Sequence, residues 1–295
     1  MITSMKRLSL VLAAMIVSSA SGAVTEPLVV VPFKKDGQLL VIEARINGSE
    51  PAIFVIDSGA SHTVFDPKFA RQLGLEVQSA APTTGTGVGD VSKSITKPVR
   101  ITLSGFTFDL PEPWVIDLSK APLPAGTMGL LGAEIFKSHV VKIDPGASSV
   151  SIFDPASSPD AKGASVPLIV DGDKLFLEAV LEAPAGKTVT HKLRIDTGSE
   201  SSINDEVVQQ SEEVRTSTLG GGLGENFKSY SGVFTSAKIG PFTFKKFWGP
   251  GGPRPAIGME LLRRFVLTFD APHGRLYLEP TAHLDEPVPT PPPGP

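Results

Sequence analysis

Two aspartates stand in nearly identical short motifs, and their chemistry depends on whether they meet. Asp57 and Asp196 each follow apolar residues and precede a hydroxyl residue and a glycine, Ser58-Gly59 and Thr197-Gly198. Two carboxyl groups within about 3 Å cannot both ionise comfortably, so they share one proton and titrate as a pair. The ionised member can take a proton from water while the protonated member polarises a carbonyl group. Such a pair predicts peptide-bond hydrolysis without metal, cofactor or covalent intermediate.

The two motifs lie within an internal repeat of the sequence. A single Asp-Ser/Thr-Gly segment would be read as an ordinary turn, but its duplication within a repeated unit favours a functional role. The matching segments, all in the same order, are 55–61 with 193–199, which correspond at Asp57 and Asp196, 105–108 with 241–244, 130–136 with 256–262, and 140–144 with 266–270. Duplication of one folding unit explains this order. We expect the two units to associate about a pseudo-two-fold axis that brings the aspartates face to face, with Gly59 and Gly198 allowing close backbone approach.

Each unit is predicted to be a compact β structure, so the fold class is all-β with two similar halves. Apolar or alternating residues at 39–46 and 175–181 predict strands, each leading through a turn into a second strand that ends at the aspartate. Short helical signals follow Gly132 and Gly258, at 133–138 and 259–264. We expect halves at 24–156 and 165–281, joined by the polar, turn-rich linker 157–164.

At these residues the sequence resembles the aspartic proteases, most closely the retropepsin-like branch. The resemblance rests on Asp57-Ser58-Gly59-Ala60 and Asp196-Thr197-Gly198-Ser199, completed by Leu130-Leu131-Gly132 and Ile257-Gly258, and extends over about residues 28–280. It implies an all-β fold with the active site in a cleft between the halves. It also implies that Asp57 and Asp196 form the catalytic pair and that Ser58 and Thr197 support it across the interface. Retropepsins are usually dimers of one-motif subunits, so this chain is expected to work as a monomer on peptide or protein substrates.

Two glycine-rich segments occupy corresponding places in the halves, at 83–89 and 220–224. Their permissive backbone suits hairpin flaps that fold over a substrate, which makes Gly85, Gly87, Gly89, Gly222 and Gly224 candidate substrate-binding residues. Two flexible surface loops are the alternative reading. A phosphate cradle is disfavoured because neither segment supplies the Lys-Ser/Thr pair of a P-loop.

Composition excludes several other functions. The chain has 27 Lys+Arg against 31 Asp+Glu, so no broad basic surface for nucleic acid is expected. It has no cysteine and no histidine spacing typical of a metal site, and we expect neither metal nor cofactor. A two-carboxylate glycosidase needs its carboxyl groups at least about 5 Å apart and is disfavoured. A non-catalytic peptide-binding module on the same fold remains the main alternative.

The N-terminal residues predict a signal peptide, and the C-terminal residues predict a proline-rich tail. Lys6-Arg7, the apolar run 8–17 and the small residues 21–23 are typical of a cleaved signal peptide, 1–23. A membrane anchor is the alternative, but the run is shorter than the roughly 20 residues of a spanning helix. We therefore expect an exported protein, periplasmic or secreted, without stable membrane insertion. Residues 282–295 are expected to form a proline-rich tail, extended and solvated from 286 onward.

Four smaller features carry expectations of their own. Ala256 replaces the larger apolar residue that usually precedes the second Ile-Gly and is expected to loosen the packing behind Asp196. Glu200 is expected to face solvent, and so is the charge pair Arg263-Arg264. His62 is expected to lie on a surface turn.

Overall fold

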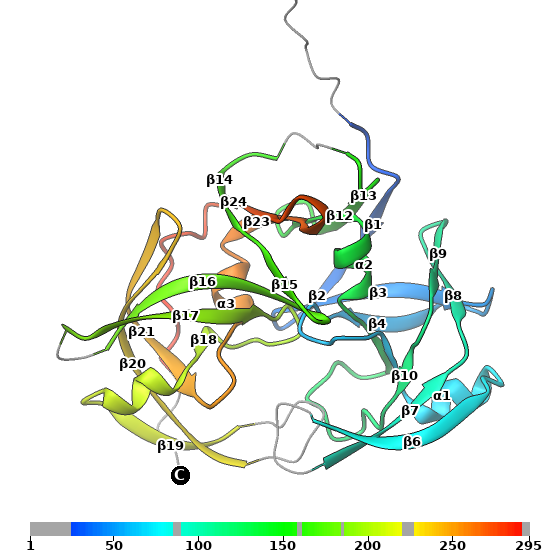
Figure 1. Cartoon of the computed structure of the whole chain (residues 1–295), viewed down its shortest axis with the longest axis horizontal. Coiled ribbons are helices and arrows are strands. Elements are labelled where there is room, and N and C mark those ends of the chain that lie inside the picture. Colours follow the sequence, from blue (N-terminus) through cyan, green and yellow to red (C-terminus); the bar gives the residue numbers. More distant parts are fainter. Residues whose placement is uncertain (1–24, 85–89, 158–160, 184–185, 220–226, 291–295) are drawn as a thin grey trace, which may run out of the picture.

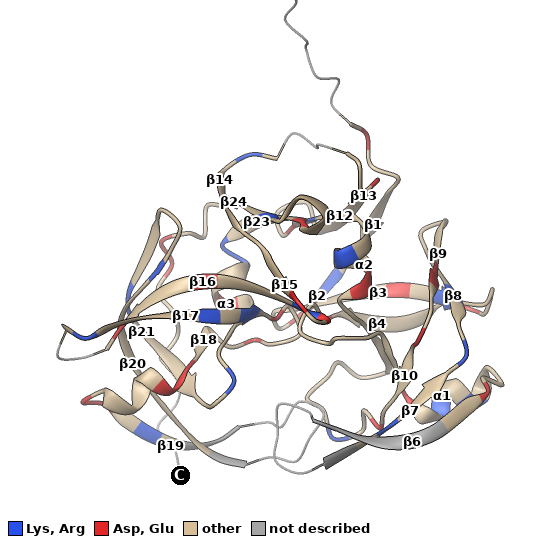
Figure 2. Ribbon diagram, in the orientation of Figure 1, with Lys and Arg blue, Asp and Glu red and all other residues tan. Residues whose placement is uncertain are grey.

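The computed structural model describes residues 25–84, 90–157, 161–183, 186–219 and 227–290. Within them the chain is built almost wholly of strands, and Figure 1 shows two β-rich halves side by side, joined by a sheet at the top of the view. The all-β prediction is therefore confirmed. Charged residues of both signs are scattered over both halves in Figure 2 rather than gathered on one face.

The first half is one curled sheet that carries Asp57 at the end of a central strand. In spatial order its strands are β6 (Val77–Thr84), β7 (Asp90–Thr96), β10 (Trp114–Val115), β5 (Val64–Phe65), β11 (Thr127–Leu131), β4 (Ala52–Ile56), β3 (Leu39–Ile46), β8 (Val99–Leu103) and β9 (Phe106–Leu110), with β2 (Lys34–Asp36) paired to β3. The predicted strand 39–46 is β3. It alternates buried and partly exposed residues, as a strand covered mainly on one face does.

The second half repeats this plan around Asp196. Its described strands run in the order β18 (Ile203–Asn204), β22 (Ala256–Ile257), β17 (Thr188–Ile195), β16 (Lys174–Glu182), β20 (Phe227–Ile239) and β19 (Val214–Leu219), with β15 (Ile169–Asp171) on β16 and β21 (Phe242–Gly251) on β20. The predicted strand 175–181 lies inside β16. As in the first half, the aspartate follows a strand flanked by one antiparallel and one parallel neighbour.

A six-stranded sheet contains strands from both halves and fixes them to each other. Its order is β1 (Val29–Pro32), β13 (Ser149–Phe153), β12 (Val140–Asp144), β23 (Phe265–Asp270), β24 (Arg275–Pro280) and β14 (Ala164–Pro167). The central pair, β12 and β23, joins one copy of the repeat to the other, with Val141 opposite Phe269. Because main-chain hydrogen bonds cross this boundary, the two halves share one structural frame.

Two short helices support the strands of each half, at corresponding positions. The two predicted ones are α2 (Glu134–Ser138) and α3 (Met259–Leu262). The sequence analysis missed α1 (Pro67–Gln72) and the 3-10 helix η2 (Glu206–Gln210). Asp66 and Asp205 cap these two, accepting hydrogen bonds from the backbone N–H groups of Lys68 and Val207. Another 3-10 turn, η3 (Ala271–His273), leads into β24.

The start of the C-terminal tail is attached to the protein, so the expectation of a solvated tail from 286 onward is wrong for its first residues. Val288 packs against the core, and Glu286 accepts a hydrogen bond of 2.9 Å from Arg263. The expectation of a solvated Arg263-Arg264 pair is also wrong, since Arg264 is 1% exposed. Its guanidinium donates to Glu260 and to backbone carbonyls of the tail, which satisfies the buried charge.

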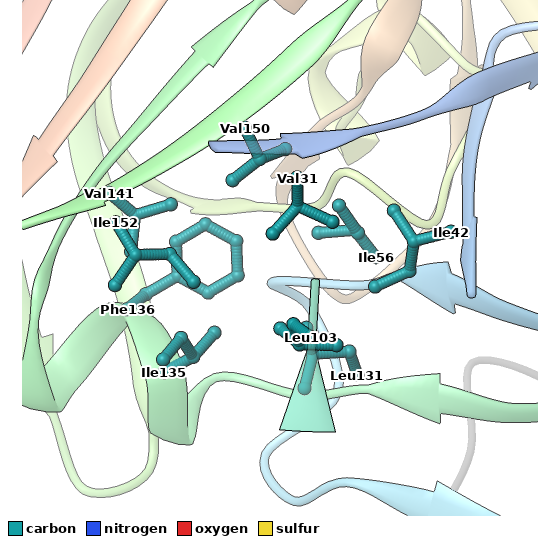
Figure 3. Close-up of a pocket in the computed structure, with 10 residues that line it drawn as sticks. All are labelled: Val31, Ile42, Ile56, Leu103, Leu131, Ile135, Phe136, Val141, Val150 and Ile152. Carbon is teal, nitrogen blue, oxygen red and sulfur yellow. The ribbon is translucent and has the colours of Figure 1, made fainter. Parts of the chain in front are cut away.

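An apolar cavity lies within the core of the first half, as Figure 3 shows. The side chains around it are Val31, Ile42, Ile56, Leu103, Leu131, Ile135, Phe136, Val141, Val150 and Ile152. It offers no polar side chain to a ligand and is a packing space on the core face of β4. Within the described residues, no helix has both the length and the apolar character needed to cross a bilayer.

Candidate active site

The local fold holds each aspartate directly after a buried strand. The backbone N–H of Asp57 donates to the carbonyl of Leu131 at 2.9 Å, and that of Asp196 donates to Ile257 at 3.0 Å. The apolar-Gly blocks are needed because their backbone lies against the motif loop. A Cβ on Gly132 would come within 2.4 Å of the backbone of His62, and one on Gly258 within 2.5 Å of the carbonyl of Ser201. Only glycine fits these two contacts.

The hydroxyl residues of the motifs lock the halves together. The backbone N–H of Ser58 donates to Thr197 Oγ1 at 2.9 Å, and the N–H of Thr197 donates to Ser58 Oγ at 3.1 Å. Each hydroxyl then donates across the interface to a strand-end carbonyl, Ser58 to Ile195 and Thr197 to Ile56. Ser58 and Thr197 are both fully buried. Reciprocal hydrogen bonds in a buried place hold the two strand ends in one relative position.

Each carboxyl group lies against the glycine that follows the opposite aspartate. A Cβ on Gly59 would lie 2.5 Å from Cγ of Asp196, and a Cβ on Gly198 would lie 2.4 Å from Cγ of Asp57. The structure therefore brings together the two motifs that lie 139 residues apart in the sequence. The glycines serve close approach here, since neither has a positive φ.

The two carboxyl groups have different partners, which breaks the symmetry of the site. Asp57 Oδ1 accepts hydrogen bonds from the N–H groups of Gly59 at 2.9 Å and Ala60 at 3.1 Å. Asp196 Oδ2 instead accepts from the guanidinium Nη2 of Arg194 at 2.6 Å. Arg194 replaces Val55 of the first half, and the sequence analysis did not single it out. Strand alternation was the available signal, since residues two apart in a strand share a face.

Burial and charge raise the proton affinity of Asp57. Desolvation is the largest cause, the neighbouring Asp196 adds to it, and together they raise the pKa of Asp57 from 3.8 to about 7. Arg194 and the two N–H groups oppose the shift but do not cancel it. Because Arg194 is bonded to Asp196, the geometry favours a proton on Asp57 and an ionised Asp196.

The face of the first-half sheet that carries Asp57 is apolar. We call its buried residues the apolar cluster: Leu39, Val55, Val64, Ile116, Leu118 and Leu130, with the partly exposed Val41, Trp114 and Leu123 against them. It is separate from the main core, to which the alternate strand residues such as Leu40 and Ile56 belong. On the side of the first half, the carboxyl pair is therefore bordered by the apolar cluster, of which only Val41, Trp114 and Leu123 are partly exposed.

His62, Glu200 and Ala256 all lie near the two motifs. His62 does not lie on an open surface turn: its ring stacks on Trp114 at 4.2 Å, and desolvation lowers its pKa. Glu200 is exposed as expected, and its carboxylate accepts from the backbone N–H of Gln38 at 2.7 Å. Ala256 lies beside Arg194 in the sheet, where Leu130 lies beside Val55 in the first half. The small side chain of Ala256 thus lies next to the long side chain of Arg194.

The candidate flap glycines, Gly85, Gly87, Gly89, Gly222 and Gly224, lie outside the described residues. The strands that flank them are described and form antiparallel pairs, β6 with β7 and β19 with β20. Among the residues that the structure describes, no group of three or more His, Asp or Glu side chains is arranged to hold a metal ion.

Comparisons with known proteins point to one family and one fold. Residues 42–135, which include Asp57 and the first apolar-Gly block, match the aspartyl protease family. Among solved structures, an aspartic proteinase from Irpex lacteus matches with a TM-score of 0.53, covering 88% of this chain and 99% of that chain at 14% identity. At that identity the likeness shows the fold. No curated protein matches the sequence significantly.

Proposed function

We propose that the chain is an aspartic endopeptidase of the retropepsin- and pepsin-like type whose Asp57 and Asp196 activate a water molecule. The aspartyl protease family match over residues 42–135 and the aspartic-proteinase fold support this proposal. The observation that carries the proposal is the reciprocal contact of each carboxyl with the opposite glycine, held by the Ser58–Thr197 hydrogen bonds. Both carboxyl groups come from one chain, so the proposed enzyme acts as a monomer. We also propose that it acts after export, as residues 1–23 predict.

The unequal partners of the carboxyl groups assign them different roles in the proposed reaction. Asp196, ionised beside Arg194, takes a proton from the bound water as it attacks the peptide carbonyl. Asp57, protonated below about pH 7, donates a hydrogen bond to the carbonyl oxygen, which becomes a hydroxyl of the tetrahedral intermediate. Collapse of the intermediate breaks the C–N bond, and a proton passes from the pair to the leaving amine.

The apolar cluster supports a peptide as the substrate class. Val41 and Trp114 are only partly buried and lie on the face that carries Asp57, so they can contact an apolar side chain of a bound peptide. Burial of such a side chain contributes about 1.5–3 kcal/mol. That binding energy helps to align the peptide bond with the carboxyl pair.

The deciding experiment is hydrolysis of a mixed peptide library from acidic to neutral pH by the parent, Asp57→Asn and Asp196→Asn. Each substitution keeps the shape of the side chain and removes its ionisation, so we expect cleavage to fall at least about 1,000-fold with the fold intact by circular dichroism. Asp144→Asn, which changes a carboxylate in a surface turn, serves as the matched control and is expected to cleave like the parent.

Two outcomes would contradict the proposal. Equal cleavage by the parent and both active-site variants would assign the hydrolysis to another site or another protein. Absence of cleavage by the parent, with peptide binding retained, would identify a non-catalytic peptide-binding module on this fold.

A further inference from the structure

The sheet faces that carry Asp57 and Asp196 are equivalent in position but opposite in character. In the first half, Val55 pairs with Val41 and Leu130; in the second half, Arg194 pairs with Phe176 and Ala256 in the same way. Continuing the two antiparallel registers places Leu39 opposite Asp57 and Lys174 opposite Asp196. At two of these equivalent positions a cation has therefore replaced an apolar residue.

Lys174 and Arg194 belong to the face that bears the carboxyl groups and not to the core. Their strand neighbours Leu175, Leu193 and Ile195 are fully buried in the main core, so alternation directs Lys174, Arg194 and Asp196 to the other face. Figure 2 shows basic residues along β17. The second half thus has a basic surface where the first half has the apolar cluster.

Cations gather around Lys174 on this surface. Burial lowers the pKa of Lys174, and the charges of the neighbouring Arg194 and Arg254 lower it further. Asp196 pairs with Arg194, and Asp171 pairs with Lys192 on the same face, but no described carboxylate pairs with Lys174 or Arg254. The Nε of Arg194 is buried and has no hydrogen-bond acceptor among the described residues. Hydrogen-bond donors of Lys174, Arg194 and Arg254 therefore remain without an acceptor among the described residues next to the carboxyl pair.

We propose that Lys174, Arg194 and Arg254 form a subsite for an acidic side chain of the substrate, beside the bond that is cleaved. A Glu or Asp carboxylate there would accept from Lys174 and offset the mutual repulsion of the three cations. The apolar cluster takes an apolar residue on the other side of the same bond. This inference rests on the proposed function, and it assigns the enzyme to peptides with an apolar–acidic pair at the cleavage point.

Matched peptides test the subsite. Two series of peptides are used, one for each residue that flanks the cleaved bond. Within a series, that residue is Glu, Gln or Leu and the rest of the peptide is unchanged. We expect the parent to show about ten-fold higher kcat/KM for Glu than for Gln at one of these positions, because one charge-assisted hydrogen bond is made or lost. The preference should weaken as salt concentration rises.

Three substitutions show whether Lys174 makes the preference. Lys174→Leu installs the equivalent residue of the first half and is expected to abolish it, whereas Lys174→Arg keeps the charge and should retain it. Lys192→Leu changes a lysine on the same face that is already paired with Asp171 and should leave it intact. Equal rates for Glu and Gln peptides at both positions, or an unchanged preference in Lys174→Leu, would overturn the inference.

Binding separates failure of the subsite from failure of the proposed function. Calorimetric titration of the Asp57→Asn variant with the same peptides needs no chemistry, and we expect about ten-fold tighter binding of the Glu peptide than of the Gln peptide. Selective binding without cleavage by the parent would remove the protease and keep the subsite. Cleavage by the parent with equal binding of the two peptides would keep the protease and remove the subsite.

Discussion

At the scale of single residues, Arg194 makes the two carboxyl groups unequal. Its hydrogen bond to Asp196 takes the place of the N–H groups that hold Asp57 in the other half. Alternation along β17 is enough to put Arg194 on the face of Asp196, so the sequence contained this signal. The bond itself could not be predicted, because alternation gives the face of a side chain and not its conformation.

Replacement of Arg194 by valine, the residue of the first half, should shift the pH profile upward. Arg194 favours ionised carboxyl groups and lowers the pKa of Asp57, so without it the pair keeps its proton to higher pH. We expect the basic limb of the pH profile of kcat/KM to move to higher pH. The midpoint of the titration of the Asp57 carboxyl carbon, followed by NMR, should move in the same direction. Arg194→Lys retains a cation and should shift less. Identical limits in all three proteins would rule out this role.

Gly198→Ala should damage the site without disturbing the fold elsewhere. The added Cβ would lie 2.4 Å from Cγ of Asp57, so that carboxyl group must move. We expect a loss of about 100-fold or more in kcat/KM, since small displacements of reacting groups are costly. Gly146→Ala, at an exposed turn where the nearest atom is 3.3 Å away, is the matched control. Activity equal to the control would mean that the close approach is not needed.

At the scale of elements, strands such as 39–46 and 175–181 and two of the helices were predictable, because apolar alternation and the repeated blocks specify them directly. The helices α1 and η2 were missed because each is short and lacks a long apolar period. The capping aspartates Asp66 and Asp205 were a usable signal, since they lie 139 residues apart, as Asp57 and Asp196 do. The burial of Arg264 was missed for another reason: it depends on tail residues that lie about 20 positions later.

The two capping aspartates should differ in what they contribute to stability. Asp66→Ala removes one cap and is expected to lower the free energy of unfolding by about 1 kcal/mol. Asp205→Ala should cost about 2–4 kcal/mol, because that fully buried carboxylate also binds His191 at 2.6 Å. Urea denaturation measures both, and Asp66→Asn, which can still cap, should stay close to the parent. A larger loss in Asp66→Ala than in Asp205→Ala would contradict this ranking.

At the scale of the whole molecule, the carboxyl pair should destabilise the folded protein as pH rises. The pKa of Asp57 is about 7 in the folded state against an ordinary 3.8, so the folded state holds a proton that the unfolded state releases between these values. The stabilising effect of that proton is complete below about pH 3.8 and is lost as pH rises to about 7.

The Asn side chain of the Asp57→Asn variant cannot ionise, so this variant should not lose stability as pH rises through this range. We expect the variant to gain stability relative to the parent from pH 4 to pH 7 and to exceed it by about 1–3 kcal/mol at pH 8. Thermal and urea unfolding across pH measure the difference. Asp36→Asn, at an exposed position, is the control and should follow the parent. A constant difference between Asp57→Asn and the parent at all pH values would exclude the raised pKa.

Both copies of the repeat lie in one continuous polypeptide, and β12 pairs with β23 across their boundary. The two copies can therefore change independently during evolution. In a homodimer of one-motif subunits, any change to the motif is made twice, so an arginine beside one aspartate would bring a second arginine beside the other. Here each copy can mutate alone. Fusion thus lets one half keep valine and leucine while the other acquires Arg194 and Lys174, and a polarised site becomes accessible to natural selection.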